Sequence, residues 1–114
     1  MTVPDEAGHI VVLTTLENAE QARTLVRQLV EDRLVACGTI FDGVQSIYRW
    51  RGTVEQAGET VVLLKTRRDR WEALASAIAA RHPYEVPELL ALPVERGLDA
   101  YLSWVTEETT EESV

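Results

Sequence analysis

The stretch that decides the fold is residues 44–66, "VQSIYRWRGTVEQAGETVVLLKT". Its first seven residues alternate as a β-strand does, and one face carries Val44, Ser46, Tyr48 and Trp50. The apolar run at residues 59–66 predicts the returning strand, with the turn predicted from Gly52 to Gly58. Such a β-hairpin is longer than the core of a small domain needs, so we expect another surface to cover it.

Strand and helix patterns alternate on the N-terminal side of this hairpin. Residues 9–15, "HIVVLTT", are β-branched and predict a buried strand. Residues 18–34 repeat apolar side chains at helical spacing, which predicts an amphipathic helix. Residues 35–41, "VACGTIF", predict the strand that leads into the hairpin, with a bend or bulge at residues 42–43.

The same order of elements returns on the C-terminal side. Residues 69–82 predict a second helix that Pro83 ends, because the residue before a proline disfavours the α conformation. Residues 88–94, "ELLALPV", predict a short strand, and residues 98–105 a last short helix. Each of the two longer helices begins with a predicted capping box, formed by Asn18 with Gln21 and by Asp69 with Glu72.

This order, β–α–β twice and then a helix, predicts an α+β fold. Specifically, we expect a ferredoxin-like split βαβ sandwich with an extended β-hairpin and a short C-terminal helix. Residues 1–114 have the length of a single domain. The ordered core is expected at about residues 8–107, between a short N-terminal tail and an acidic C-terminal tail.

Composition and charge exclude several classes of protein. The chain has 11 Lys and Arg against 19 Asp and Glu, a net charge of −8 that disfavours binding to nucleic acid. No apolar run approaches the roughly 18 residues of a membrane span, and the N-terminus lacks the pattern of a signal peptide. We therefore expect a cytoplasmic protein with neither nucleic acid nor membrane as a partner.

Residues 80–89, "ARHPYEVPEL", contain the best candidates for metal ligands. Imidazole and carboxylate groups bind copper and zinc, and His82, Glu85 and Glu88 lie within seven residues of one another. Their spacing is not a known chelating pattern, and His82 also falls on the apolar stripe of its helix. The alternative is that His82 packs at the end of the helix while Pro83 turns the chain.

Large aromatic side chains on the hairpin and the last helix predict an interface between subunits. Tyr48, Trp50 and Trp104 exceed what a small core needs, although they could instead complete the core of the monomer. Lys65 either binds an anion in a cleft or pairs with a carboxylate at a strand end. A candidate inter-subunit pocket comprises Tyr48, Lys65, His82, Tyr84 and Glu88.

Six stretches together resemble the CutA family of divalent-cation tolerance proteins. They are "LVACGTI", "SIYRWRG", "E-x-x-x-x-L-K-T", "HPYEVPEL", "LPVERG" and "YLSW", and the resemblance covers roughly residues 9–105. It implies a ferredoxin-like protomer, a tight homotrimer formed through long strands, and a link to copper and other divalent metals. It also implies His82 and Glu88 as the metal ligands.

The chain departs from the family pattern at several positions. Thr14 and Thr15 lie where a cysteine of the first strand is sometimes added to the metal site. Cys37 belongs to another strand and is expected to be a small buried side chain. Without a thiolate, the expected site is harder and suits Cu(II) or Zn(II) rather than Cu(I). Thr39 and Asp42 replace the family's usual asparagine and proline.

The function predicted from these observations is that of a trimeric divalent-cation tolerance protein that binds copper or a similar divalent metal. One alternative is a trimeric module that senses small molecules and resembles the architecture of PII signalling proteins. Another is a non-catalytic scaffold. The sequence has no GxSxG or HExxH motif and no convincing nucleophile beside a base, so we do not expect an enzyme.

Overall fold

The computed structural model describes residues 7–110 of the chain; residues 111–114 of the acidic tail and most of the predicted N-terminal tail lie outside this part. No helix in residues 7–110 has the length and apolar character needed to cross a membrane. The elements follow the predicted order: β1 (His9–Leu16), α1 (Ala19–Glu31), β2 (Cys37–Trp50), β3 (Thr53–Arg67), η2 (Arg68–Arg70), α2 (Trp71–Arg81), β4 (Leu89–Pro93) and α3 (Asp99–Glu108).

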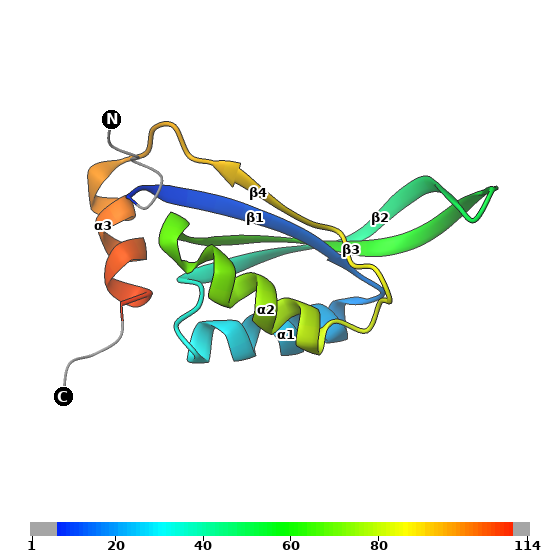
Figure 1. The fold of residues 1–114 in the computed structure, drawn as a ribbon, viewed down its shortest axis with the longest axis horizontal. Helices are drawn as coiled ribbons and strands as arrows, with labels where there is room; N and C mark the ends of the chain where they lie inside the picture. Colours follow the sequence, from blue (N-terminus) through cyan, green and yellow to red (C-terminus); the bar gives the residue numbers. More distant parts are fainter. Residues whose placement is uncertain (1–6, 111–114) are drawn as a thin grey trace.

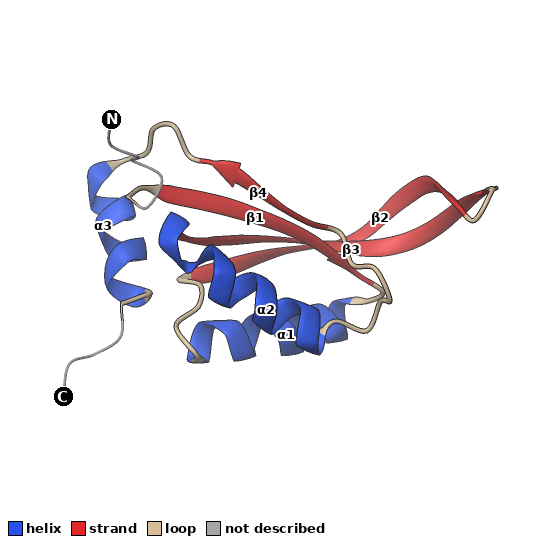
Figure 2. Cartoon of the chain, in the orientation of Figure 1, coloured by secondary structure: helices blue, strands red, loops and turns tan. Residues whose placement is uncertain are grey.

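The strands form one antiparallel sheet in the order β2-β3-β1-β4, with α1 and α2 side by side on one face (Figures 1 and 2). Alternate residues of the central strands face these helices, so that Val12 and Leu64 are fully buried. Leu29 of α1 and Ile78 of α2 fill the other side of the core. The α+β, ferredoxin-like prediction is confirmed.

The hairpin of β2 and β3 projects beyond the helices (Figure 1). Its turn consists of two residues, Arg51 and Gly52, with φ values of 51° and 83°, and Trp50 pairs directly with Thr53. Two successive positive φ angles match the twist of a tight hairpin. The predicted turn from Gly52 to Gly58 was wrong, because the polar residues that suggested a loop belong to the exposed part of β3.

A bulge interrupts the pairing of β2 with β3 between Phe41 and Val44, as the sequence predicted. The Asp42 carboxylate holds it by accepting hydrogen bonds from the Thr60 hydroxyl and the Gly43 N–H, both at 2.8 Å. Gly43 has φ 74°, a conformation that glycine adopts without strain. Asp42 therefore stabilises the bend at a position where the family resemblance implied proline.

The helix ends follow the predictions only in part. Asn18 caps α1, since its Oδ1 accepts a hydrogen bond from the Gln21 N–H at 2.8 Å. The Gln21 side chain accepts from the Glu17 N–H at 3.1 Å instead of returning to Asn18. The second predicted capping box was wrong: α2 follows the 3-10 turn η2 without a side-chain cap, and Asp69 pairs with Arg67 at 3.1 Å.

Helix α3 lies at the end of the sheet opposite the hairpin tip (Figure 1). Arg67 fastens its C-terminal end, because its guanidinium donates to the Thr109 hydroxyl at 3.0 Å and to the Thr109 carbonyl at 2.9 Å. His9 forms a further hydrogen bond with the Thr106 hydroxyl at 2.9 Å. Thr109, which directly follows α3, is fully buried.

Candidate functional site

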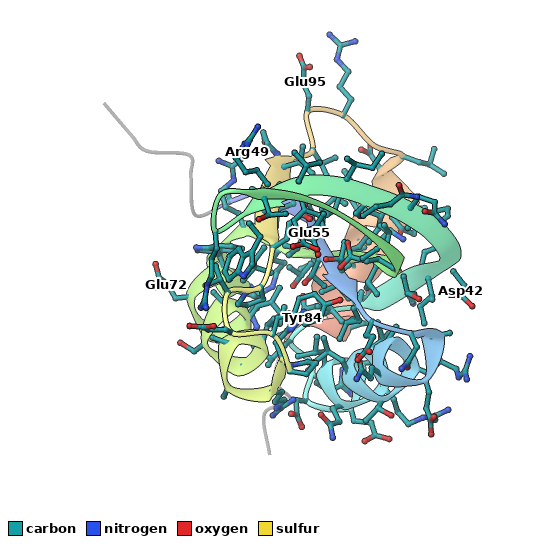
Figure 3. All side chains as sticks on the ribbon, turned by 90° about the vertical axis from the view of Figure 1, so that its right-hand side faces the viewer. Asp42, Arg49, Glu55, Glu72, Tyr84 and Glu95 are labelled. Carbon is teal, nitrogen blue, oxygen red and sulfur yellow. The ribbon has the colours of Figure 1, made fainter. Side chains whose placement is uncertain are left out.

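A groove of about 790 Å³ lies between the hairpin and the segment of residues 82–88 that joins α2 to β4. Figure 3 views it from the hairpin end and shows Tyr84 beneath the hairpin, whereas Glu72 and Glu95 lie on the outside. We call it the acidic groove, because the described residues that line it include four glutamates and neither lysine nor arginine. Its lining residues are Thr15, Glu17, Ser46, Ile47, Tyr48, Trp50, Ala57, Gly58, Glu59, Tyr84, Glu85, Val86 and Glu88.

Tyr84 joins two walls of the acidic groove. Its hydroxyl donates a hydrogen bond of 2.8 Å to a carboxylate oxygen of Glu59, which comes from β3. Burial raises the pKa of Tyr84 above its ordinary value, and the charges of Glu59 and Glu17 raise it further. The phenol therefore stays protonated near neutral pH and acts as a donor to Glu59.

His82 packs behind the acidic groove rather than in its lining. It is buried at the end of α2, and its Nε2 lies 2.7 Å from the carbonyl oxygen of Thr15 on β1. Since a carbonyl only accepts, Nε2 carries the proton, and Nδ1 accepts the Tyr84 N–H at 3.1 Å. Both nitrogens are used in the fold, and neither presents a free lone pair to a metal.

The predicted metal ligands are not brought together as a chelating set. Glu85 pairs with Arg51 at 3.3 Å, where both side chains are more than 70% exposed, at 73% and 71%. Glu88 lies in the acidic groove, which His82 does not line. Within residues 7–110, no group of three or more His, Cys, Asp or Glu side chains is placed to hold a metal ion. The residues as arranged do not fit a preassembled metal centre.

Within one protomer, three residues of the predicted inter-subunit pocket lie together. Tyr48, Tyr84 and Glu88 line the acidic groove together. Lys65 is not among its lining residues; it pairs with Cys37 in the register of β2 and β3, and its Nζ donates to the Thr39 hydroxyl at 2.6 Å. Lys65 thus contacts a hydroxyl, and no carboxylate of residues 7–110 forms an ion pair with it.

Cys37 is half-buried, not fully buried as expected, and its Sγ lies 3.6 Å from the Tyr101 hydroxyl of α3. This hydrogen bond, together with burial, raises the pKa of Tyr101 to about 12. The contact ties the start of β2 to α3 and lies outside the acidic groove, whose lining contains no cysteine. Cys37 therefore supplies no ligand there.

Glu17 and Glu59 belong to the acidic groove but were not predicted from the sequence. Glu17 directly follows β1, and Glu59 pairs with Val44 in the register of the hairpin. With the two-residue turn, alternation would have placed Glu59 on the same hairpin face as Tyr48. The strand register was therefore the signal that could have identified Glu59. The longer turn predicted from Gly52 to Gly58 hid this register.

The three aromatic side chains predicted at an interface do not complete the core of the protomer. Tyr48, Trp50 and Trp104 are 44%, 42% and 39% exposed. On the sheet face away from α1 and α2, Phe41, Leu90 and Leu92 are exposed as well. This protomer thus presents more apolar surface on one side than isolated surface residues would explain.

Comparison with known proteins gives a consistent result over nearly the whole chain. The family described as CutA1 divalent ion tolerance protein matches residues 10–108. The divalent-cation tolerance protein CutA of Thermus thermophilus is 46% identical over 99 residues, covering 87% of this chain and 96% of that protein. A chloroplastic protein CutA of Arabidopsis thaliana is 39% identical over 108 residues, covering 95% of this chain and 57% of that longer protein.

Solved structures agree with the fold. The divalent cation tolerance protein of Thermus thermophilus superposes with a TM-score of 0.87 at 44% identity, covering 90% of this chain and 99% of that one. The protein CutA1 of Oryza sativa gives 0.89 at 35% identity, covering 95% and 99%. A structure from Archaeoglobus fulgidus, named periplasmic, gives 0.87 at 32% identity, covering 90% and 99%.

Proposed function

The chain belongs to the CutA1 divalent ion tolerance family, and we propose that it acts in divalent-cation tolerance as a homotrimer that binds copper or a similar divalent metal. The observation that carries the metal part is the acidic groove, with its four glutamates and no lysine or arginine in the described lining. A cleft lined by charge of one sign raises the local concentration of ions of opposite charge. We place this activity in the cytoplasm and assign it no catalytic step.

The metal would be held by separate carboxylates and not by a preassembled chelate. Glu59 and Glu88 are the proposed ligands, since both line the acidic groove and Glu85 is engaged with Arg51. Oxygen ligands alone give a hard, weak site. His82 would add nitrogen ligation, as the family resemblance implied, only if its hydrogen bond to Thr15 were broken.

The homotrimer is proposed from the uncovered surfaces of the protomer. The hairpin overhangs the core, and β2 and β4 are the two edge strands of the sheet. Unpaired edges and exposed apolar faces favour association with another chain. Exposed Tyr48, Trp50 and Trp104 would then be buried between subunits.

Sedimentation and calorimetry test the two parts separately. Sedimentation at low micromolar concentration should report a trimer, and a monomer would contradict the assembly. Titration with Cu(II) and Zn(II) should show binding that the double variant Glu59→Gln with Glu88→Gln weakens. Glu95→Gln is the matched control, because Glu95 is exposed and lies away from the acidic groove (Figure 3). Equal binding by all variants would refute the metal site, and a trimer without metal binding would favour a scaffold.

A further inference from the structure

We propose that Lys65 of one copy forms an ion pair with Glu55 of the partner subunit, and that a ring of such pairs fixes how the copies associate. This inference rests on the proposed homotrimer and names a charged contact within it. It starts from Lys65, which is the only lysine of the chain. Lys65 is partly buried on the interior strand β3, and no carboxylate of residues 7–110 pairs with it.

Lys65 lies in an otherwise uncharged part of the sheet face that points away from α1 and α2. The strand register defines two neighbouring rows of side chains across β2, β3, β1 and β4. The first row consists of Cys37, Lys65, Val11 and Leu92. The second row consists of Thr39, Leu63, Leu13 and Leu90. Lys65 is the only charged side chain in these two rows.

This face of the sheet needs a cover. The strand β1 is apolar on both of its faces, a pattern typical of strands that are buried on both sides. The helices α1 and α2 cover only one side (Figure 1), and Leu90 and Leu92 on the other side are 54% and 48% exposed. A second copy that covers them would also remove Lys65 from water. Because an ammonium group is costly to bury without a counter-charge, the second copy must bring a carboxylate.

The protomer itself leaves the Lys65 ammonium available for such a partner. Arg67, the next residue on this face of β3, already pairs with the Asp69 carboxylate at 3.1 Å. Lys65 donates only to the Thr39 hydroxyl, at 2.6 Å. A lysine ammonium has three N–H groups, so two of them remain for an acceptor outside the protomer.

The hairpin supplies the matching carboxylate. It projects beyond the helices (Figure 1), and Glu55 lies on it, exposed and directly opposite Tyr48 in the register of β2 and β3. Tyr48 is one of the side chains that the proposed homotrimer buries between subunits. Glu59, the other carboxylate of β3, already accepts a hydrogen bond from Tyr84.

Cyclic symmetry allows these two groups to meet. Lys65 and Glu55 lie near opposite ends of β3, so they cannot pair within one protomer. In a cyclic trimer each surface of one copy contacts a different surface of the next copy. Each subunit boundary can therefore contain one Lys65 and one Glu55.

The test is sedimentation of the full-length protein and its variants over a range of concentrations, which gives the concentration at which half of the trimer dissociates. Lys65→Met keeps a long apolar side chain without the charge. It should raise this concentration at least about ten-fold, because Glu55 is then left unpaired in the contact. Glu55→Gln should act in the same direction. The double variant should dissociate no more readily than the weaker single variant, because the two changes remove one interaction.

Two controls separate this effect from unfolding and from a change in net charge. Circular dichroism of each variant should match that of the original protein, since Thr39 and Glu55 are exposed in the protomer. Arg27→Met removes the same charge from the exposed side of α1, away from the sheet, and should leave the trimer unchanged.

The outcomes distinguish this proposal from the homotrimer on which it rests. A native protein that sediments as a monomer would overturn both. A native trimer that Lys65→Met does not weaken, or additive effects in the double variant, would overturn the ion pair alone. Weakening by Lys65→Met but not by Glu55→Gln would also overturn it, and would favour a bound anion or another carboxylate as the partner of Lys65.

Discussion

Replacing Gly38 by alanine tests how closely β2 packs on α1. Gly38 pairs with Leu64 of β3 and lies against Val26 of α1. A Cβ added at this position would lie 2.8 Å from Val26 Cγ1, 2.9 Å from Leu64 Cδ2 and 3.1 Å from Val26 Cγ2. Carbon atoms in contact normally lie about 3.5–4.0 Å apart, so at least one neighbour must move.

The energetic cost depends on which neighbour moves. The Leu64 methyl is at the end of a flexible side chain and can rotate away. Val26 is β-branched and strongly prefers one rotamer in a helix, so relief there requires an off-rotamer side chain or a shift of α1. Overpacking of a core costs about 1–3 kcal/mol, and we expect about 2 kcal/mol here. That corresponds to a decrease in Tm of roughly 8 °C.

Thermal and urea unfolding measure this effect, and all variants are compared at one fixed protein concentration because the Tm of an oligomer depends on it. Gly58→Ala in β3 is the control, because a Cβ there meets nothing within 4 Å and should change stability by less than about 0.5 kcal/mol. Adding Val26→Ala to Gly38→Ala should cost less than the sum of the single changes. If Gly38→Ala unfolds like Gly58→Ala, or if the two costs simply add, the packing argument is refuted.

Three further substitutions test hydrogen bonds that the structure places. His82→Ala should lower the free energy of unfolding by about 1–3 kcal/mol in metal-free buffer, because one buried and one partly buried hydrogen bond are lost. Unchanged stability would contradict the structural role of His82. Asp42→Ala should lower the free energy of unfolding in urea by about 1–2 kcal/mol. The same substitution should cost less in a Thr60→Val background, because the Thr60 hydroxyl that loses its acceptor is then absent. The pKa of Tyr101 is about 12 in the folded protein, against an ordinary value of 10. The protonated Tyr101 therefore contributes its full stabilisation of the folded state below pH 10, and this contribution is lost as the pH rises to 12. Unfolding free energy should therefore fall more steeply over that range in the original protein than in Tyr101→Phe, and equal slopes would contradict the assignment.

Periodicity along the chain was sufficient to predict the order of strands and helices, because burial on one face repeats every two residues in a strand and about every 3.6 in a helix. The bulge at Asp42 and the cap at Asn18 were also predictable, since each depends on neighbouring residues. The hairpin tip was not. Arg51 adopts a positive φ because the strands on both sides are paired, and no short stretch of sequence shows that pairing.

The acidic groove could be predicted only in fragments. Tyr84 and Glu88 were chosen from one short segment, but Glu17 and Glu59 reach the same groove from β1 and β3. For His82 the sequence left two alternatives, metal ligand or packing residue. The antiparallel sheet places the Thr15 carbonyl 2.7 Å from its Nε2 and so gives the ring a structural partner. Local sequence thus determines the helices and strands. Contacts between segments that are distant in the sequence form only when these elements pack together, because their side chains come within hydrogen-bonding range only in the folded chain.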